Sequence, residues 1–597
     1  MHVARQAGVA APQAMVAGML PAVEEVLPAP EDVRPWSRLR AALRRIDGWG
    51  PLAWKEIHGA WRLPAGVLVV TSPETEPGDD DDRRVLFLVV DHGLGAGDPI
   101  ATSDWMLRHT WATVLAKPLI SAWTIRPGQS VRATNACWGE AGSGSGGGRL
   151  VLRLEILLPY AGMCIDAKRC GRFLTRVAQF ADDLAVVRRR PELERHRRAL
   201  VLQRALRAAL PAHGLCAFIG EGAILPRAAD GGPFPGAAPV RVPSALRTTL
   251  DLGRLGRITG WGIPHGVTAI TGAPYHGKST VLQALQAGID DHPPGDGRER
   301  VVVADSALLV QAEDGRAIKA QDLSGFFAAL PGADATNFST QRASGATSMA
   351  ASVLQGVAAG CKLLLVDEDT AASNFLLIDP VLRRLLGRTL HGNRTLLEVL
   401  PALAAQGVAT VLVAGSNGHA LAVAERVVQM DHWQPHDVTR RARKLTGPRP
   451  AALVRWPRAR RYLAAQPDAL FGERNFAPCD LREPERPRLK LPTFRELGTR
   501  EVAHWHQLDL RRSGWVLDEA LVAGALAAAG WCCRLAPQGA DLAALESAYR
   551  ALVAHGAQAL DPFHTRLLAV PPWQLVVGVL ERLPVPAVAS STVTEVA

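Results

Sequence analysis

The stretch Val267–Gln283 reads VTAITGAPYHGKSTVLQ, and it determines how the rest of the chain is interpreted. Its first five residues are mostly apolar and predict a strand, whereas the residues from Lys278 onward predict a helix. The connection has the P-loop pattern G-x-x-x-x-G-K-[ST], as Gly272-Ala273-Pro274-Tyr275-His276-Gly277-Lys278-Ser279. In such a loop, backbone N–H groups converge on one centre and the helix N-terminus adds positive charge. The stretch therefore predicts a phosphate-binding loop.

Two residues of this loop have chemically defined roles. We expect the Lys278 ammonium group to contact the β- and γ-phosphates of a nucleotide, and the Ser279 hydroxyl to bind magnesium. The residues predicted to contact the nucleotide here are Gly272, Ala273, Pro274, Tyr275, His276, Gly277, Lys278, Ser279 and Thr280. The alternative is an accidental match in a glycine-rich turn, and the strand–loop–helix context argues against it.

A second motif provides carboxylates. Residues 362–368, KLLLVDE, form an apolar run that ends in Asp367 and Glu368, which is the Walker B arrangement. We expect Asp367 to hold magnesium through water, and Glu368 to polarise the attacking water as the catalytic base. Adjacent acids also occur on ordinary surfaces, but their place on an apolar strand downstream of a P-loop favours the catalytic interpretation.

A serine–glycine turn precedes the Walker B strand by about twenty residues. Residues 343–348, ASGATS, lie just ahead of an alanine-rich helix, so that Ser344, Gly345, Thr347 and Ser348 become candidate contacts for an anion. This is where ABC-type ATPases carry their signature loop. The alternative is an ordinary serine N-cap. The D-loop-like run DEDTAASN at 367–374 favours the signature.

Together these segments resemble the predicted ATPase of the ABC class family. The similarity rests on Arg257–Leu285, His292–Glu299, Ala312–Arg316, Phe338–Ser352 and Leu363–Phe375, flanked by Leu39–Gly59, Phe218–Arg227 and Met430–Thr439. The resemblance implies a soluble protein without transporter domains, with a family-specific region before the ATPase core. It also implies ATP and magnesium as cofactors. In the ABC architecture, two chains form an ATP-sandwiched homodimer, in which Ser344 and Gly345 of one subunit contact the γ-phosphate held by Lys278 of the other.

The sequence departs from the ABC pattern at the switch histidine. That residue is expected just after the apolar run Thr410–Ala414, where Ser416 stands nearest and His419 comes slightly later. Three alternatives follow: contact of the γ-phosphate by Ser416, by His419 or by neither. Glu313 and Arg316 fit either a catalytic loop or a solvated turn.

Two further roles have more than one candidate. Trp261 and Tyr275 are the candidate adenine-stacking aromatics, although a core position is the better interpretation of Trp261. The glutamine that senses partners in ABC proteins is either Gln311 or Gln321. The sequence does not choose between them.

Composition limits the remaining classes. The chain has 597 residues, a net charge of +10 and eight cysteines without paired metal-ligand spacing. This argues against a disulfide framework or a zinc site and predicts a reducing compartment, which we take as the cytoplasm. The alternative is a mitochondrion or another organelle, because the first 27 residues form a weak presequence. The longest apolar run, Ala520–Cys533, is too short to cross a bilayer, so no membrane domain is expected.

The expected fold class is α/β, with a P-loop NTPase core of ABC type, an N-terminal α+β domain and a mostly helical C-terminal extension. Five regions are predicted: a disordered segment 1–35, the α+β domain 36–245, the core 246–440, a basic proline-rich linker 441–492 and the helical domain 493–597.

These observations predict a magnesium-dependent ATPase whose homodimer drives a conformational change. RNA or DNA is a candidate partner, because residues 188–207 and 440–462 are strongly basic. The rival class is a nucleotide-switched clamp that binds protein partners with little turnover and no nucleic acid. A small-molecule kinase is disfavoured, because kinases do not need a signature or a D-loop.

Overall fold

The computed structural model describes residues 29–71, 83–91, 99–116, 122–123, 130–140, 149–157, 160–161, 164–187, 191–304, 306–330, 332–390, 392–448, 462–463, 488–497, 500–510, 512–515, 518–535, 540–561 and 567–583. Most of the segment predicted to be disordered, and much of the predicted linker, lie outside these residues. The chain divides into two compact units, Met1–Leu200 with Ala551–Val570 and Val201–Arg550 with Pro571–Ala597. The predicted domain bounds stay a prediction.

The first unit is built on a seven-stranded sheet with the order β1-β2-β3-β4-β7-β5, in which β6 also pairs with β7. Its ladder of β4 with β7 is antiparallel over nine residue pairs. The elements are η1 Pro30–Asp32, β1 Arg34–Pro35, α2 Trp36–Arg45, η2 Pro51–Ile57, β2 Gly59–Leu63, β3 Gly66–Val70, β4 Arg83–Asp91, α3 Pro99–Ala116, β5 Ala122–Trp123, β6 Cys137–Glu140, β7 Arg149–Leu157, β8 Tyr160–Ala161, β9 Cys164–Ile165, α4 Ala167–Val187, the start of α5 Pro191–Ala209, and η10 Ala557–Leu560.

Apolar side chains explain why α2 and α4 cover this sheet. Leu43 of α2 and Leu174 of α4 are buried in one cluster with Leu86 and Leu152 of the strands. The unit is not continuous in sequence, because residues near 568 return to it. The backbone N–H of Asn135 donates to the carbonyl oxygen of Leu568 at 3.1 Å, and the Asn135 side chain accepts from the Leu568 N–H at 2.8 Å.

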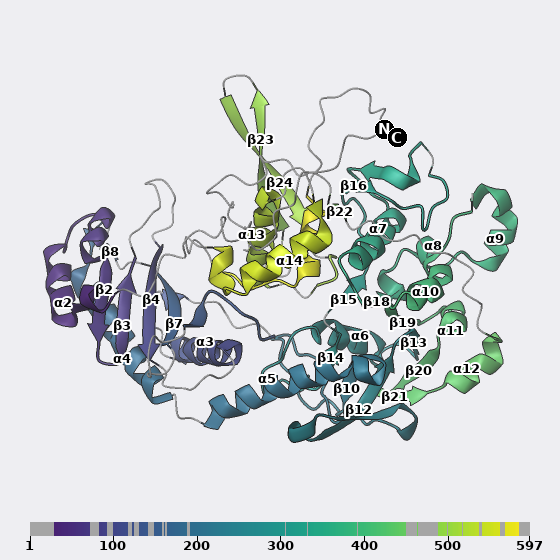
Figure 1. Ribbon diagram of the computed structural model, residues 1–597, viewed down its shortest axis with the longest axis horizontal. Coiled ribbons are helices and arrows are strands. Elements are labelled where there is room, and N and C mark those ends of the chain that lie inside the picture. The colour runs from purple at the N-terminus through teal and green to yellow at the C-terminus, as the bar shows by residue number, and fades with distance from the viewer. Residues whose placement is uncertain are drawn as a thin grey trace. The chain divides into compact units, whose positions relative to one another are not determined.

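The second unit contains a six-stranded sheet with the order β15-β18-β19-β13-β20-β21 (Figure 1). Every neighbouring pair is parallel except β20 with β21. Its strands are β13 Val267–Thr271, β15 Ala307–Val310, β18 Leu363–Asp367, β19 Ala409–Val413, β20 Arg426–Asp431 and β21 Gln434–Asp437. The central strands are buried on both faces, which explains their nearly continuous apolar sequences. This confirms the predicted α/β core.

A four-stranded antiparallel sheet with the order β11-β12-β10-β14 packs against the same core. The bounds are β10 Leu215–Gly220, β11 Arg247–Asp251, β12 Arg257–Pro264 and β14 Val301–Val303. The apolar sequence of residues 301–304 predicts a strand of the buried parallel sheet, but that prediction is wrong, because β14 pairs antiparallel with β10. A short apolar run has the same pattern in either sheet, and only its partner distinguishes them.

The helices and small strands of this unit surround the two sheets. They are η3 Pro211–His213, η4 Ser244–Leu246, η5 Gly253–Leu255, α6 Lys278–Ala287, β16 Ile318–Gln321, η6 Ala335–Asn337, β17 Phe338–Thr340, α7 Gly345–Ala358, η7 Glu368–Thr370, α8 Ser373–Leu376, α9 Pro380–Leu386, η8 Gly387–Leu390, α10 Leu396–Ala405, α11 His419–Val423, α12 Thr439–Thr446, β22 Tyr462–Leu463 and β25 Ala540–Asp541. Helix α6 buries Val281 and Leu285 in a cluster with residues of both sheets.

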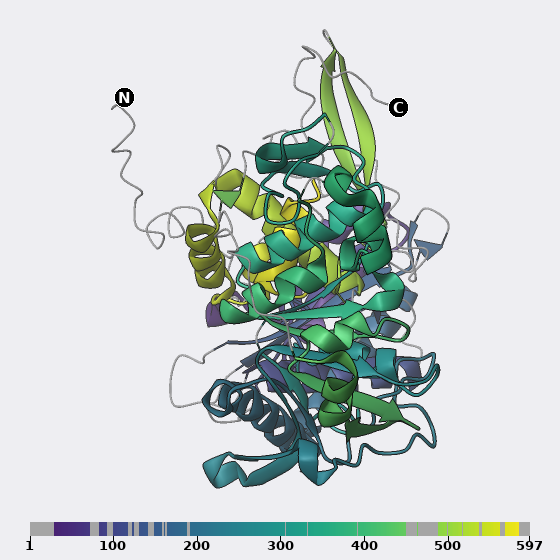
Figure 2. The same ribbon diagram turned by 90° about the vertical axis from the view of Figure 1, so that its right-hand side faces the viewer.

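The C-terminal extension is helical, as expected, in α13 Glu519–Leu535, α14 Leu542–Val553 and α15 Trp573–Leu580. A long hairpin precedes these helices, with β23 Arg488–Leu497 paired to β24 Arg500–Asp509, and it projects from the rest of its unit (Figures 1 and 2). The sequence analysis missed it. No helix among the described residues is long and apolar enough to span a membrane.

Candidate nucleotide-binding site

The P-loop joins the buried strand β13 to helix α6, as the sequence predicted. Gly272 has φ +139°, and a Cβ atom there would lie 2.3 Å from the carbonyl oxygen of Met430. Gly277 has φ +93°, and a Cβ atom there would lie 2.7 Å from the Trp433 ring. Only glycine fits at both positions, because backbone angle and space each exclude a side chain.

Lys278 lies at the start of α6 and points back along the loop. Its ammonium group donates to the carbonyl oxygen of Ala273 at 2.9 Å. A Cβ atom built on Gly415 would lie 3.7 Å from the Lys278 Cε atom, so the loop that follows β19 is next to the lysine. The structure therefore brings Lys278 and the residues after β19 to the same edge of the parallel sheet.

Ser279 and Asp367 form the first contact between the P-loop and the Walker B strand. The Ser279 hydroxyl donates to the Asp367 carboxylate at 2.9 Å. The sheet topology explains this contact, because the carboxyl ends of the parallel strands β13 and β18 lie at the same edge. A hydroxyl and a carboxylate oxygen are hard ligands that suit magnesium, so this pair fits the expected ion.

Glu368 is held by the loop that follows β19. Its carboxylate accepts from the N–H groups of Gly415 at 2.7 Å, Ser416 at 3.0 Å and Asn417 at 3.3 Å, and from the Ser416 hydroxyl at 2.5 Å. Partial burial raises the pKa of Glu368, but the hydrogen bonds from Ser416, Gly415 and Asn417 outweigh it and leave that pKa below its ordinary value. The carboxylate is thereby kept ionised, as a base requires.

The two switch candidates differ in placement. Ser416 contacts Glu368 directly, whereas His419 is exposed at the start of α11 and its backbone N–H donates to the Asn417 side chain at 2.9 Å. The structure therefore joins Ser416 to the Glu368 carboxylate, and it shows no such contact for His419. Thr280 is half-buried in the first turn of α6.

The serine–glycine turn begins helix α7. Ser344 is the N-cap, because its hydroxyl accepts from the Thr347 N–H at 3.3 Å, and its side chain is exposed. Ser348 is fully buried, and its hydroxyl donates to the Gly345 carbonyl at 2.9 Å. The same hydroxyl accepts from the Glu313 N–H at 2.9 Å. Ser348 therefore fixes the helix to the neighbouring loop, while Ser344 faces outward.

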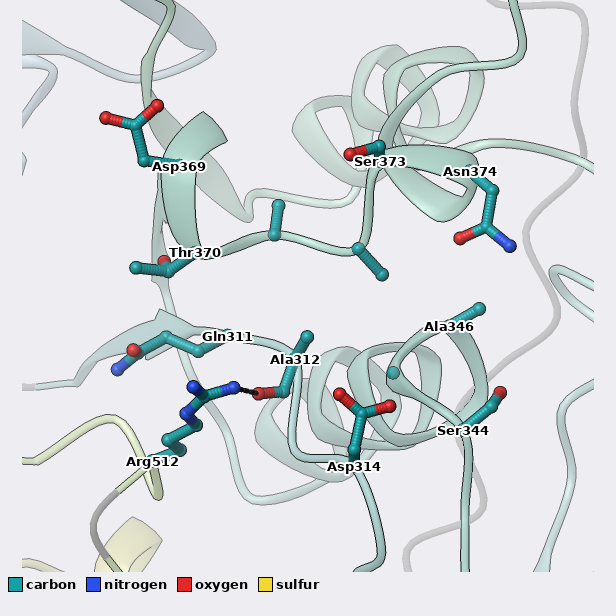
Figure 3. Close-up of a pocket in the computed structure, with 13 residues that line it drawn as sticks. Gln311, Ala312, Asp314, Ser344, Ala346, Asp369, Thr370, Ser373, Asn374 and Arg512 are labelled. Carbon is teal, nitrogen blue, oxygen red and sulfur yellow. Dashed lines mark hydrogen bonds between the residues drawn. The ribbon is translucent and has the colours of Figure 1, made fainter.

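A pocket of about 830 Å³ lies between this turn and the D-loop. Figure 3 shows Ser344, Ala346 and Asp314 across the pocket from Asp369, Thr370 and Ser373. Its lining residues are Gln311, Ala312, Asp314, Ser344, Gly345, Ala346, Asp369, Thr370, Ala371, Ala372, Ser373, Asn374 and Arg512. Gln311 follows β15 directly and lines the pocket, whereas Gln321 lies on the separate two-stranded sheet of β16 and β17.

Glu313 and Arg316 are part of a buried network of charges. Arg582, which follows α15, donates to both oxygens of the Glu313 carboxylate, at 2.9 and 2.5 Å. Arg316 donates to the same carboxylate at 3.3 Å and to Gln355 of α7 at 2.5 Å.

Two neighbouring guanidinium groups keep the Glu313 carboxylate of this network ionised. Burial raises the pKa of Glu313, but the guanidinium groups of Arg582 and Arg316 hold it below its ordinary value. The solvated turn considered for these two residues is wrong, because the network lies inside the protein, where Glu313 and Arg316 are 6% and 8% exposed.

The aromatic residues divide into core and surface. Trp261 is fully buried and cannot contact a nucleotide. Tyr275 is 93% exposed at the tip of the P-loop with φ +63°. Trp433, which sequence reasoning missed, is 48% exposed and packs on Gly277. A two-residue hairpin turn beside a P-loop has no linear signature, so only the fold reveals Trp433.

The basic segments are partly neutralised. In α5, Arg204 and Arg207 form ion pairs with Asp291 at 2.8 and 2.9 Å. In α12, Arg443 donates to backbone carbonyl oxygens that include Ala422 at 3.2 Å. Arg440, Arg441 and Lys444 of α12 are exposed. Residues 188–190 and 449–461 lie outside the described part of the chain.

Comparison with known proteins identifies the region that contains this site. A family model described as the ABC ATPase P-loop domain matches residues 189–461. A relative, the uncharacterized protein MJ1628 of Methanocaldococcus jannaschii, is 38% identical over 136 residues, which are 22% of this chain and 28% of that protein. The match therefore spans little more than a quarter of the relative's length.

Two solved structures match part of this chain, both with low TM-scores. CbiO1 of Clostridium perfringens, part of the ABC transporter complex cbiONQ, is 15% identical with a TM-score of 0.25, and the match covers 39% of this chain and 90% of that one. An inward-facing putative metal-chelate type ABC transporter is 17% identical with a TM-score of 0.22, over 42% of this chain and 90% of its own.

Proposed function

We propose that the chain binds and hydrolyses ATP with magnesium, because residues 189–461 match the family model of the ABC ATPase P-loop domain. The observation that carries the proposal is the convergence of three groups at one sheet edge. Lys278 begins the helix after the P-loop, and Ser279 donates a hydrogen bond to Asp367. Hydrogen bonds from the loop after β19 keep the Glu368 carboxylate ionised. A cation, a magnesium-binding oxygen pair and a base are what phosphoryl transfer to water requires.

The chain's own residues have separate tasks in this reaction. The P-loop N–H groups and Lys278 would bind the phosphates and offset their charge. Ser279 and Asp367 would hold magnesium, which neutralises charge that develops on the phosphate oxygens. Glu368 would accept a proton from the attacking water, and the N–H groups of Gly415 and Ser416 keep its carboxylate in place.

We further propose that two copies of the chain complete each site. The pocket beside Ser344 and Gly345 is lined by D-loop residues, and its lining includes neither Lys278 nor Ser279. The exposed Ser344 turn, at a helix N-terminus, therefore offers its anion-binding geometry away from its own P-loop. A symmetric partner that faces this surface would supply its nucleotide phosphates to the turn.

Replacing Lys278 by alanine is expected to weaken ATP binding by about 10- to 100-fold, because the variant loses charged hydrogen bonds to the phosphates. Isothermal titration with ATP measures the change. Lys362→Ala is the matched control, since Lys362 is an exposed lysine at the opposite end of the Walker B strand. Unchanged ATP affinity in Lys278→Ala would refute the nucleotide site.

The same variant tests the dimer. Ser344→Arg should keep the partner's bound phosphate away from the turn, while its own P-loop still binds ATP. Lys278→Ala alone and Ser344→Arg alone should therefore each have little turnover. A 1:1 mixture of the two variants should regain about a quarter of wild-type turnover, because half of its dimers contain one intact composite site. A mixture as inactive as its components would contradict a shared site.

RNA or DNA is the second part of the proposal, supported by the exposed Arg440, Arg441 and Lys444 on α12. These side chains can contact phosphates without losing an internal partner that the structure shows. Affinity for a single-stranded oligonucleotide should fall steeply with salt, and Arg440→Ala/Arg441→Ala should reduce the salt slope by about 2. Absence of binding at low salt, with slow turnover that RNA does not change, would favour the nucleotide-switched protein clamp.

The compartment is part of the same proposal. Cys137, Cys170, Cys216 and Cys361 are buried free thiols, which supports the reducing cytoplasm rather than an oxidising compartment.

A further inference from the structure

A second group of potential ligands lies at the P-loop, and its side chains are given no role in the proposed ATP hydrolysis. His276 belongs to the P-loop, while Asp431 ends strand β20 and His432 begins the turn to β21. Each offers one ligand atom, and these atoms all lie within 4.8 Å of one another. The group shares no residue with the Ser279–Asp367 pair.

The distances within the group are close to those of a metal site. The Asp431 carboxylate oxygen Oδ1 lies 3.1 Å from His276 Nδ1 and 2.8 Å from His432 Nδ1. In a tetrahedral zinc site, ligand atoms at about 2.0–2.2 Å from the ion are about 3.3 Å apart. The distances from Asp431 to His276 and to His432 are therefore shorter than this spacing by about 0.2 and 0.5 Å, so these two pairs need to separate only slightly to admit an ion.

The backbone holds His432 over the P-loop at a conformational cost. His432 and Trp433 have φ +46° and +62°, the left-handed region that bulky residues rarely adopt. The N–H groups of both residues donate to His276, to Nδ1 and to the carbonyl oxygen respectively, each at 3.3 Å. The ring centroids of His276 and His432 lie 4.6 Å apart. This strained turn keeps both histidines beside one carboxylate, and such strain is typical of ligand sites.

The ligand chemistry selects the class of ion. Two imidazoles and one carboxylate suit divalent transition metals such as Zn²⁺ and leave one tetrahedral position open. Magnesium prefers oxygen ligands and is a poor match. Four buried thiols are weak competitors, because burial raises the pKa of Cys137, Cys170, Cys216 and Cys361 to about 12.

We propose that His276, Asp431 and His432 bind a divalent transition-metal ion that ties the β20–β21 turn to the P-loop. The site stands independently of the proposed ATP hydrolysis. The side-chain distances among the three residues do not depend on a bound nucleotide.

Cobalt titration of the chelator-treated full-length chain, in excess Mg²⁺ and without nucleotide, tests this site. We expect one equivalent of Co²⁺ with tetrahedral d–d absorption, no thiolate charge-transfer band, and displacement by Zn²⁺. His432→Asn removes the imidazole but suits the left-handed turn, and it should weaken Co²⁺ binding at least about tenfold, as should Asp431→Asn.

Three controls make the result specific. His436→Ala removes an exposed histidine from β21 of the same hairpin and should leave Co²⁺ affinity unchanged. Ser279→Ala should also leave it unchanged, which separates this site from the magnesium pair. Circular dichroism should show all variants folded. Absence of saturable binding, equal loss in His436→Ala, or full affinity in His432→Asn and Asp431→Asn would each overturn the proposal.

Discussion

Glu368→Gln is expected to lower the kcat of ATP hydrolysis by about 10²- to 10⁴-fold, the usual contribution of a positioned general base. Glutamine has nearly the shape of glutamate, and its amide oxygen can still accept from the N–H groups of Gly415 and Ser416. The substitution therefore removes the proton acceptor while it preserves the fold of the loop. Phosphate release under saturating ATP and magnesium measures kcat.

The charge-matched control is Glu299→Gln, in the loop before β14, which should keep wild-type turnover. ATP affinity of Glu368→Gln should stay within a few-fold of wild type, because the carboxylate is not among the groups expected to bind phosphate. With ATP, the variant should elute as a dimer in size-exclusion chromatography. Turnover near the wild-type rate would eliminate Glu368 as the base, and a monomer with ATP would argue against the sandwich.

Glu313→Ala is expected to destabilise the second unit by about 3–5 kcal/mol, because it leaves two buried guanidinium groups without their shared carboxylate. Arg582 and Arg316 both donate to Glu313, and burial already lowers the pKa of Arg316 to about 10. Hydrogen exchange in peptides of α7 and α15 measures the free energy of local opening.

Asp314→Ala is the matched control, because the next residue is also an acid but is exposed. It should change stability by less than about 0.5 kcal/mol. Arg582→Met in the Glu313→Ala background should cost less than Arg582→Met alone, which a double-mutant cycle would detect. If the stability changes of the two substitutions simply add, Glu313 and Arg582 do not stabilise each other.

The ATPase core was predictable because its signals are linear. The strand Val267–Thr271, its P-loop and the strand Leu363–Asp367 each combine an apolar run with a polar end, and parallel strands then place those ends at one edge. The contact of Ser416 with Glu368 was harder to predict, because the two residues are 48 positions apart in sequence. Spacing narrowed the choice to Ser416 and His419, and the geometry of the loop after β19 separates them.

Other features have no local signal. Glu313 and Arg582 are 269 residues apart in sequence, so nothing near either residue indicates that both are buried. The left-handed pair His432–Trp433 is equally hidden, because hairpin turns of this kind favour asparagine and glycine. The hairpin at residues 488–509 was missed, because residues 488–492 were assigned to the proline-rich linker and the rest to the helical domain.

The return of residues 551–570 to the N-terminal unit has a practical consequence for anyone who shortens this gene. A recombinant fragment that stops at residue 550 would retain Asn135 but lose both of its hydrogen bonds to Leu568. Sequence order alone would suggest that such a deletion affects only the C-terminal region. Damage from a late stop codon should also reach the opposite end of the polypeptide, for example as new protease cleavage around residues 130–140.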